Sequence, residues 1–342
     1  MVLLFVAIHV RSNDYGLFGD VRGRLIPVYA NERTSKYLFS YNYIPSNFEG
    51  LLLGSSLSHN LNTKEVTGFK IYNGSLSGAN FTELDLIAKN VIKRGKLKFI
   101  VICLHPYTTQ THGRRSSFMN PHEYWESLGS LATLDLYRHK ILVLLGKKEV
   151  ISNEYGFHDR NLDKKIDSRK KISQAANSLM KSGKGIEIDE IAYKELADLV
   201  VSARSQDVKI FAYFHPLPYE LYLAQQESFA DFQDKIKPLF TKQDRVWDFN
   251  SGQYLSFRRD YGNYIDHAHL SPKGARFILK EIVRNLNDDE TSRHFLNPKR
   301  HDWNDTRIKK ILPTMFNNDA STFLDTAKKR NTGNLNENHH QN

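Results

Sequence analysis

The sequence predicts an α/β fold with a doubly wound, mainly parallel five-stranded sheet. Five short apolar runs are bounded by turn residues and show no polar–apolar alternation, which is typical of parallel strands that are covered on both faces. Helix-like stretches separate these runs, and alternation of strand and helix favours a doubly wound arrangement. A length of 342 residues suits one large domain, or one domain with additions.

The expected strands follow the apolar runs in chain order. They cover residues 51–53, 69–72, 97–104, 208–214 and 246–249. Helices are expected within residues 80–95, 188–205 and 271–286, where apolar residues recur at helical spacing. Gly95 ends the first of these helices, whereas Ser271 caps the last and Pro272 takes its first position.

The remaining segments set the expected domain organisation. Residues from about 108 to 184 form a long insertion between the third and fourth strands, and insertions at that place often shape substrate access. We therefore expect an N-terminal segment over 1–48, a domain over 49–290 and a C-terminal extension over 291–342. The end from about residue 331 is rich in asparagine and is expected to be disordered.

The N-terminus reads "MVLLFVAIHV" and has more than one interpretation. Ten apolar-leaning residues are too few to cross a bilayer, which needs about twenty. A signal peptide would carry a basic flank before its apolar stretch, and there is none. A buried strand, the end of a membrane anchor and a short interfacial segment all remain open.

Composition excludes some classes of function. The net charge of +10 suits an anionic partner such as nucleic acid, an acidic polysaccharide or a phospholipid surface. The basic residues are spread along the chain without an arginine-rich arm or an RNA-binding aromatic signature, so no nucleic-acid partner is expected. The single cysteine, Cys103, excludes an intramolecular disulfide and a multi-cysteine metal site, and its apolar context predicts a buried thiol.

The stretch "EGLLLGSSLSHN" places small hydroxyl residues directly after the first strand. In a doubly wound sheet, ligands bind outside the carboxyl ends of the strands, where Gly54, Ser55 and Ser56 lie. Glycine permits a tight turn there, and a helix that began just afterwards would point free N–H groups at the same place. Ser56 is a candidate nucleophile if a base reaches it; a purely structural turn is the alternative.

The stretch "NYIDHAHLSPKGARFI" offers such a base. Asp266 lies three residues before His269, a spacing at which the carboxylate accepts from one ring nitrogen and leaves the other as a base. Alternatively, Asp266 caps local backbone and His269 packs at a helix entrance, with His267 also available. The loop follows the last strand and should return to the same sheet edge as Ser56.

Three short blocks, "GSS", "YNGSLSGAN" and "DHAHLSPKGA", resemble the SGNH (GDSL-type) hydrolase superfamily. The resemblance is closest to its envelope-associated branch, which includes polysaccharide O-acetylation and D-alanyl-transfer proteins and in which "GSS" replaces a glycine–aspartate–serine block. It covers about residues 49–286 and implies the flavodoxin-like fold of that superfamily.

The resemblance implies a role for each matching residue. Ser56 matches the nucleophile, and Asp266 and His269 match the other two members of the catalytic triad. Gly78 matches a glycine whose backbone N–H joins that of Ser56 in an oxyanion hole. Ser55 stands where many relatives have aspartate and is a candidate cleft residue. No metal and no organic cofactor are implied.

Two asparagines, Asn73 and Asn80, flank the glycine loop. We interpret both as structural, through Asx-type bonds to the backbone, although Asn80 is also a candidate cleft residue.

The chain departs from the superfamily pattern after the third strand. Relatives place an asparagine side chain of the oxyanion hole there, but this chain reads "CLHPYTTQTHG" and has no asparagine until Asn120. Thr108, Thr109 or His105 is a possible substitute, and loss of one such donor costs about 3 to 4 kcal/mol of transition-state stabilisation where tested. His105 and His215 each precede a proline at a strand end and are expected to line the cleft or to cap backbone.

The resemblance implies a serine esterase or acyltransferase that acts on acyl esters of a carbohydrate or another cell-envelope polymer. A catalytically weak or inactive module that binds a glycan or an assembly partner is the alternative. A periplasmic or otherwise extracytoplasmic, membrane-associated location follows from the resemblance, with an N-terminal anchor; a cytoplasmic location is the alternative.

Overall fold

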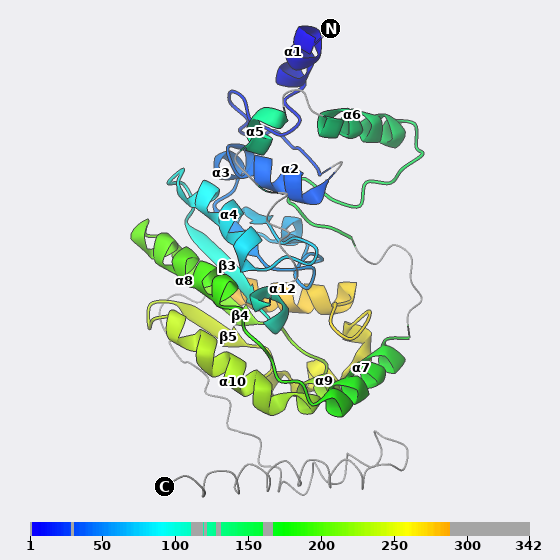
Figure 1. The fold of residues 1–342 in the computed structure, drawn as a ribbon, viewed down its shortest axis with the longest axis vertical. Coiled ribbons are helices and arrows are strands. Elements are labelled where there is room, and N and C mark those ends of the chain that lie inside the picture. Colours follow the sequence, from blue (N-terminus) through cyan, green and yellow to red (C-terminus); the bar gives the residue numbers. More distant parts are fainter. Residues whose placement is uncertain are drawn as a thin grey trace, which may run out of the picture. The chain divides into compact units, whose positions relative to one another are not determined.

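A five-stranded sheet with all strands parallel forms the centre of the protein in the computed structural model (Figure 1). The strands are β1 (Gly50–Leu53), β2 (Ile71–Asn73), β3 (Phe99–Leu104), β4 (Lys209–Phe214) and β5 (Arg245–Asp248), in the order β2-β1-β3-β4-β5. The expected strands are therefore confirmed, with ends that shift by about two residues or less, as is usual for element boundaries. The chain reverses its direction of winding between β1 and β3, where such sheets bind ligands.

The structure describes residues 2–28, 31–110, 119, 122–127, 131–159 and 167–287. These residues belong to a compact unit that spans Met1–Leu296, and a second unit spans Asn297–Asn342. The expected extension over 291–342, its disorder from about residue 331, and Asn120 lie outside the described residues.

The helices lie between and around the strands. Their bounds are α1 (Val2–Ser12), α2 (Glu32–Phe39), α3 (Tyr43–Asn47), α4 (Phe81–Ile92), α5 (His122–Glu126), α6 (Leu131–Leu144), α7 (Ser168–Ser182), α8 (Glu190–Ser205), α9 (Tyr219–Ala224), α10 (Gln226–Ile236), α11 (Leu255–Arg259) and α12 (Pro272–Asn287). The expected helices are α4, α8 and α12. Ser271 caps α12 as expected, because its Oγ accepts the Gly274 N–H at 3.2 Å.

Each face of the sheet has its own core. Side chains alternate along a strand, so Leu51 and Leu53 face a core with residues of α2, α4, α8 and α10, whereas Leu52 faces a core with residues of α11 and α12. Helices therefore cover both faces, which explains why the strands carry no polar alternation.

The N-terminal segment 1–48 is not the strand that its apolar start allowed. Residues 2–12 form the helix α1, so the buried-strand interpretation is wrong. The helix satisfies its own backbone groups, whereas a strand there would need a neighbour in the sheet. Helices α2 and α3 bury residues such as Leu38 and Tyr43 in the main core, so they are part of the same unit as the sheet. Among the described helices, none is long and apolar enough to span a bilayer.

The insertion between β3 and β4 contains α5, α6 and α7 and returns to the sheet before α8 (Figure 1). Its segment 152–158 packs on the loops after β1 and β2. The Asn73 N–H donates to Tyr155 O at 2.8 Å, and the His158 N–H donates to His59 O at 3.1 Å. The insertion thus supports the sheet edge at which a ligand is expected.

Candidate active site

Ser56 lies in a tight turn just beyond β1. The chain continues in turns over residues 56–60 rather than in a helix, and the Ser58 N–H donates to Ser55 O at 3.2 Å. No helix begins just after Ser56, so no helix N-terminus points its N–H groups at this residue. Gly54 is required by close approach, because a Cβ at this position would overlap Ser58 Oγ and lie 2.7 Å from Cys103 Cβ.

Three side chains from two distant loops form a continuous hydrogen-bonded series. Ser56 Oγ lies 2.9 Å from His269 Nε2, and His269 Nδ1 lies 2.8 Å from Asp266 Oδ2. The carboxyl ends of β1 and β5 lead to the same edge of the sheet, so the two loops meet there as expected. An ionised Asp266 accepts from Nδ1–H, which leaves the Nε2 lone pair to accept the Ser56 hydroxyl proton.

The Asp266 carboxylate is held in its charged form. Burial opposes its ionisation, but the hydrogen bond and charge of His269 and two backbone N–H donors outweigh burial and hold the pKa of Asp266 well below its usual range. Its Oδ1 accepts from the N–H groups of Ala268 and His269, each at 2.8 Å. Asp266 therefore caps local backbone and binds His269 at the same time, so the two interpretations of the sequence hold together.

A buried histidine, His215, binds the backbone of the loop that carries Asp266 and His269. His215 Nε2 lies 2.9 Å from the carbonyl oxygen of Ala268, so this nitrogen donates. Burial lowers the pKa of His215 to about 4, which keeps the ring neutral at pH 7. His215 therefore caps backbone, one of its two expected roles, and the backbone it caps lies between Asp266 and His269.

The loop after β2 carries Gly78 in the left-handed region, at φ +65°. Asn73 fixes the start of this loop, because its Oδ1 accepts the Ser75 N–H at 3.0 Å. Its Nδ2 donates to Ser58 O at 2.8 Å and thereby joins the loops after β1 and β2. The structural role expected for Asn73 is confirmed. Asn80 makes no cap hydrogen bond and donates instead to Gln110 O at 3.4 Å, so the Asx role expected for it is wrong.

The other candidate cleft residues lie in the loops after β1 and β3. Ser55 and Thr108 are fully buried, so their side chains do not line an open cleft. The Thr108 hydroxyl donates to His105 O at 2.7 Å, and that of Thr109 donates to Pro106 O at 2.9 Å. His105 accepts the Tyr107 N–H on Nδ1 at 3.1 Å, and burial lowers its pKa well below the usual value. The proton of its neutral ring therefore lies on Nε2.

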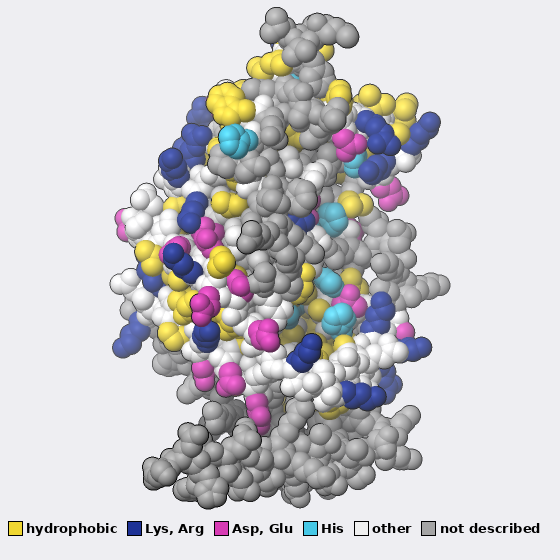
Figure 2. Space-filling view, viewed as in Figure 1, with side chains coloured by type: hydrophobic (Ala, Val, Ile, Leu, Met, Phe, Trp, Pro, Cys, Tyr) yellow, Lys and Arg dark blue, Asp and Glu magenta, His cyan; other side chains and the backbone are white. Residues whose placement is uncertain are grey.

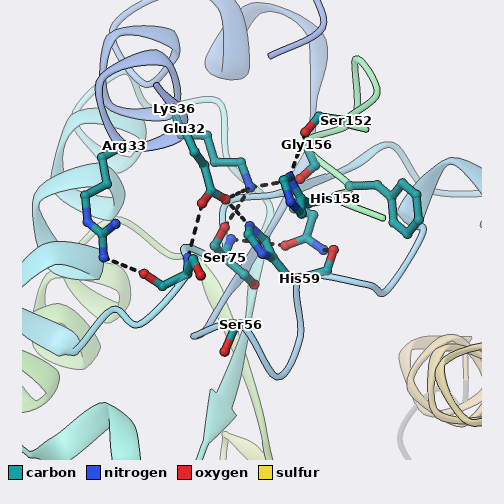
Figure 3. Close-up of polar contacts among 12 residues, drawn as sticks. Glu32, Arg33, Lys36, Ser56, His59, Ser75, Ser152, Gly156 and His158 are labelled. Carbon is teal, nitrogen blue, oxygen red and sulfur yellow. Dashed lines mark hydrogen bonds and ion pairs between the residues drawn. The ribbon is translucent and has the colours of Figure 1, made fainter. Parts of the chain in front are cut away.

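A buried ionic network lies behind the loops, and the sequence did not indicate it (Figure 3). Glu32 and Lys36, on α2, are 3.2 Å apart. Lys36 Nζ also donates to Ser75 O at 2.6 Å and to Gly156 O at 2.8 Å. His59 bonds to Glu32 through Nε2, and burial lowers the pKa of His59 to about 3. The spacing of Glu32 and Lys36 suits an ordinary surface pair, so it gave no signal of burial.

Comparisons with known proteins leave the family of this chain open. No family model matches it, and no curated protein matches it. Solved structures do match, among them a chain from Streptococcus pneumonia whose description names a platelet activating factor. That match has a TM-score of 0.39 and 13% sequence identity, and it covers 82% of this chain and 98% of the other. A likeness of this degree says nothing about the activity of this chain. Among the described residues, no cluster of His, Cys, Asp and Glu side chains suits a metal ion.

Proposed function

We propose that this chain is an SGNH-like serine esterase or acyltransferase, with Ser56 as nucleophile, His269 as base and Asp266 as the group that orients the base. The observation that carries the proposal is the series of contacts from Ser56 Oγ to His269 Nε2, and from His269 Nδ1 to Asp266 Oδ2. A hydroxyl, an imidazole and an ionised carboxylate in this order form the arrangement that activates serine in unrelated hydrolases.

The first half of the reaction transfers the acyl group to Ser56. Its Oγ bonds to the acyl carbon while His269 Nε2 takes the hydroxyl proton, and the carbonyl oxygen becomes an oxyanion. The bond from the acyl carbon to the alcohol oxygen then breaks, and His269 returns the proton to the leaving alcohol. In the second half, His269 deprotonates water or a sugar hydroxyl, which takes the acyl group and restores the Ser56 hydroxyl. Positioned proton transfer contributes about 10²- to 10⁴-fold to such steps.

The oxyanion needs donors that are in place before the reaction. The backbone N–H groups of Ser56 and Gly78 are two proposed donors. His105 is the third, in place of the asparagine of the superfamily, because its ring proton lies on Nε2 and its ring packs against that of His215 at 5.9 Å between centroids. His215 in turn bonds to Ala268 in the loop of His269. Thr108 and Thr109 are poorer substitutes, since each already donates its hydroxyl proton to a backbone carbonyl.

The proposed substrate is an acyl ester of a carbohydrate or another envelope polymer, as the resemblance of the three sequence blocks implies. The net charge of +10 favours an acidic glycan over a neutral one. The rival proposal is a glycan-binding module without turnover, for which the missing asparagine is the supporting observation.

Labelling by a fluorophosphonate probe tests the nucleophile. We expect the wild-type chain to take up the probe, and Ser56→Ala and His269→Ala to lose the label. Persistent labelling of Ser56→Ala would refute the assignment of the nucleophile. A wild-type chain that takes up no probe and cleaves no acetylated polysaccharide, but still binds it, would favour the binding module.

A location at a membrane surface is also part of the proposal. The insertion helix α6 leaves Leu134, Ile141 and Leu144 exposed, and the basic residues Arg138 and Lys147 are exposed nearby. Figure 2 shows hydrophobic and basic side chains side by side at the place where Figure 1 labels α6. Helix α1, also apolar, joins α6 through His9 Nδ1 and Tyr137 Oη, which are 3.1 Å apart. Apolar and basic residues together suit an anionic lipid surface.

Sedimentation with phosphatidylglycerol vesicles tests this location. Ile141→Ser should weaken binding, whereas Val201→Ser, which changes an apolar residue of similar exposure on α8, should leave it unchanged. Equal binding of both variants and the wild-type chain would count against α6 as the lipid contact.

A further inference from the structure

We infer that Arg33, on α2, is a positioning residue that orients and polarises the backbone N–H of Gly78 through the peptide bond before it. The inference rests on the proposed function, because Gly78 is a proposed oxyanion donor there. It concerns a residue outside all three of the sequence blocks that suggested that function.

Helix α2 holds Ser77, the residue before Gly78, at both of its backbone polar groups. The Ser77 N–H donates to Glu32 Oε2 at 3.2 Å, and the Ser77 carbonyl oxygen accepts from Arg33 Nη2 at 2.5 Å. Figure 3 shows the Glu32 and Arg33 side chains extending from α2 toward the loop that carries Ser75, with Ser56 lower in the view. Two neighbouring residues of one helix thus fix a single residue of the loop.

The two side chains are themselves fixed. Arg33 Nε donates to Glu83 Oε1 at 2.7 Å, and the Glu83 side chain, on α4, is only 1% exposed. Glu32 is bound by Lys36 and His59 in the buried network. Asn31 caps α2 through its Oδ1, which accepts the Arg33 N–H at 3.0 Å. The position of Ser77 is therefore set by α2 and α4, not by the loop alone.

The hydrogen bond from Arg33 sets the direction of the Gly78 N–H through the peptide unit that joins Ser77 and Gly78. The carbonyl of Ser77 and the N–H of Gly78 belong to the same planar trans peptide, so they point in opposite directions. With the carbonyl directed at the Arg33 guanidinium, the Gly78 N–H is directed away from α2. In Figure 3, Ser56 lies on the side of the loop away from Glu32 and Lys36.

The charge of Arg33 also strengthens the donor. A guanidinium bound to a carbonyl oxygen makes a charge-assisted hydrogen bond, and a peptide polarised at its oxygen is a better donor at its N–H. A donor fixed in this way costs no reorganisation when the oxyanion forms. Arg33 therefore contributes to the transition state without contact with the substrate.

The test compares Arg33→Gln with a matched variant, Arg204→Gln. Arg204 resembles Arg33 in its contacts, because it pairs with a buried aspartate, Asp244, and donates to Leu239 O at 2.8 Å. Hydrolysis of p-nitrophenyl acetate gives kcat and KM, and thermal unfolding gives the stability. We expect Arg33→Gln to lower kcat about 10- to 100-fold with KM within about twofold, because a misdirected donor costs less than a missing one. Arg204→Gln should lose stability but keep kcat.

A double variant separates positioning from simple destabilisation. Arg33→Gln leaves Glu83 as a buried, unpaired carboxylate, and adding Glu83→Gln removes that charge. We expect Arg33→Gln/Glu83→Gln to regain stability but not kcat, and Arg33→Lys to regain part of kcat. Recovery of kcat in the double variant, or unchanged kcat in Arg33→Gln, would overturn the inference while the proposed function stands. A wild-type chain without ester turnover and without fluorophosphonate labelling would overturn both.

Discussion

Two histidine–carboxylate pairs contact the loop after β1, and they behave differently. His269 pairs with Asp266, and the two side chains are 19% and 20% exposed. His59 pairs with Glu32, and the His59 side chain is fully buried. Both rings therefore have one nitrogen bound to a carboxylate.

The second ring nitrogen makes the difference. In His269 it meets the Ser56 hydroxyl at 2.9 Å. In His59 it is Nδ1, which is buried and has no hydrogen-bond partner in the described part of the chain, while the ring stacks on His158 at 4.7 Å between centroids. A histidine next to a carboxylate is therefore not by itself a catalytic base, because a base also needs a proton donor within reach and access for substrate.

The largest difference between the two pairs should be seen in ester turnover. We expect His269→Gln to lower kcat by about 10⁴-fold or more, since the base of a serine triad is lost. His59→Gln should change kcat by less than about tenfold, because glutamine keeps a donor for Glu32 and the ring touches no reacting atom. Steady-state hydrolysis of p-nitrophenyl acetate measures both. Comparable losses in the two variants would end the distinction.

The next largest loss of kcat is expected at Asp266, the carboxylate of the first pair. Asp266→Asn keeps the size of the side chain but stabilises the wrong tautomer of His269, and we expect kcat to fall by about 10³- to 10⁴-fold. Thermal unfolding serves as the control, because a large loss of stability would point to the backbone bonds of Asp266 instead. A fall in kcat of less than tenfold in a stable variant would argue against the triad.

The carboxylate of the second pair should matter most for stability. Glu32→Gln leaves the Lys36 ammonium buried without its counter-charge, and we expect the free energy of unfolding to fall by about 3 to 5 kcal/mol. Urea denaturation measures this loss. The variant Glu32→Gln/Lys36→Met removes both charges and should recover much of it. If the double variant were less stable than the single one, the charge pair would not be the cause.

The smallest effect in this series concerns His215, which bonds to the loop of the first pair. Its pKa is about 4 in the folded chain, because burial and His269 lower it more than the bond to Ala268 and the charge of Asp266 raise it, against 6.5 when unfolded. Below pH 6.5 the unfolded chain binds the proton first, so stability falls with pH, by about 2 kcal/mol from pH 7 to pH 5 for this group. This contribution to stability is present above pH 6.5 and is lost as the pH falls toward about 4, where the folded ring also binds a proton.

The variant His215→Asn, which keeps a donor for Ala268, isolates this contribution. We expect the dependence of its unfolding free energy on pH to be flatter than that of the wild-type chain by the same amount. Urea denaturation at both pH values measures the difference. Parallel curves for the two chains would show that His215 titrates alike in the folded and unfolded states.

Local pattern was sufficient for the strands and for the proposed triad. Apolar runs mark β1 to β5, and parallel strands bring their carboxyl ends to a common edge, so the sequence alone places Ser56 and the Asp266–His269 loop together. Asp266 and His269 are also near in sequence, which makes their bond readable from spacing.

Only the tertiary structure decided which residues support the loops at that edge. Arg33 meets Ser77 across 44 positions, and His215 meets Ala268 across 53. Such contacts depend on how α2 and the insertion pack, and no local periodicity encodes them. The directions of the hydroxyls of Thr108 and Thr109 and of the Asn80 amide were likewise open, because a polar side chain takes whichever partner the folded backbone brings within about 3 Å.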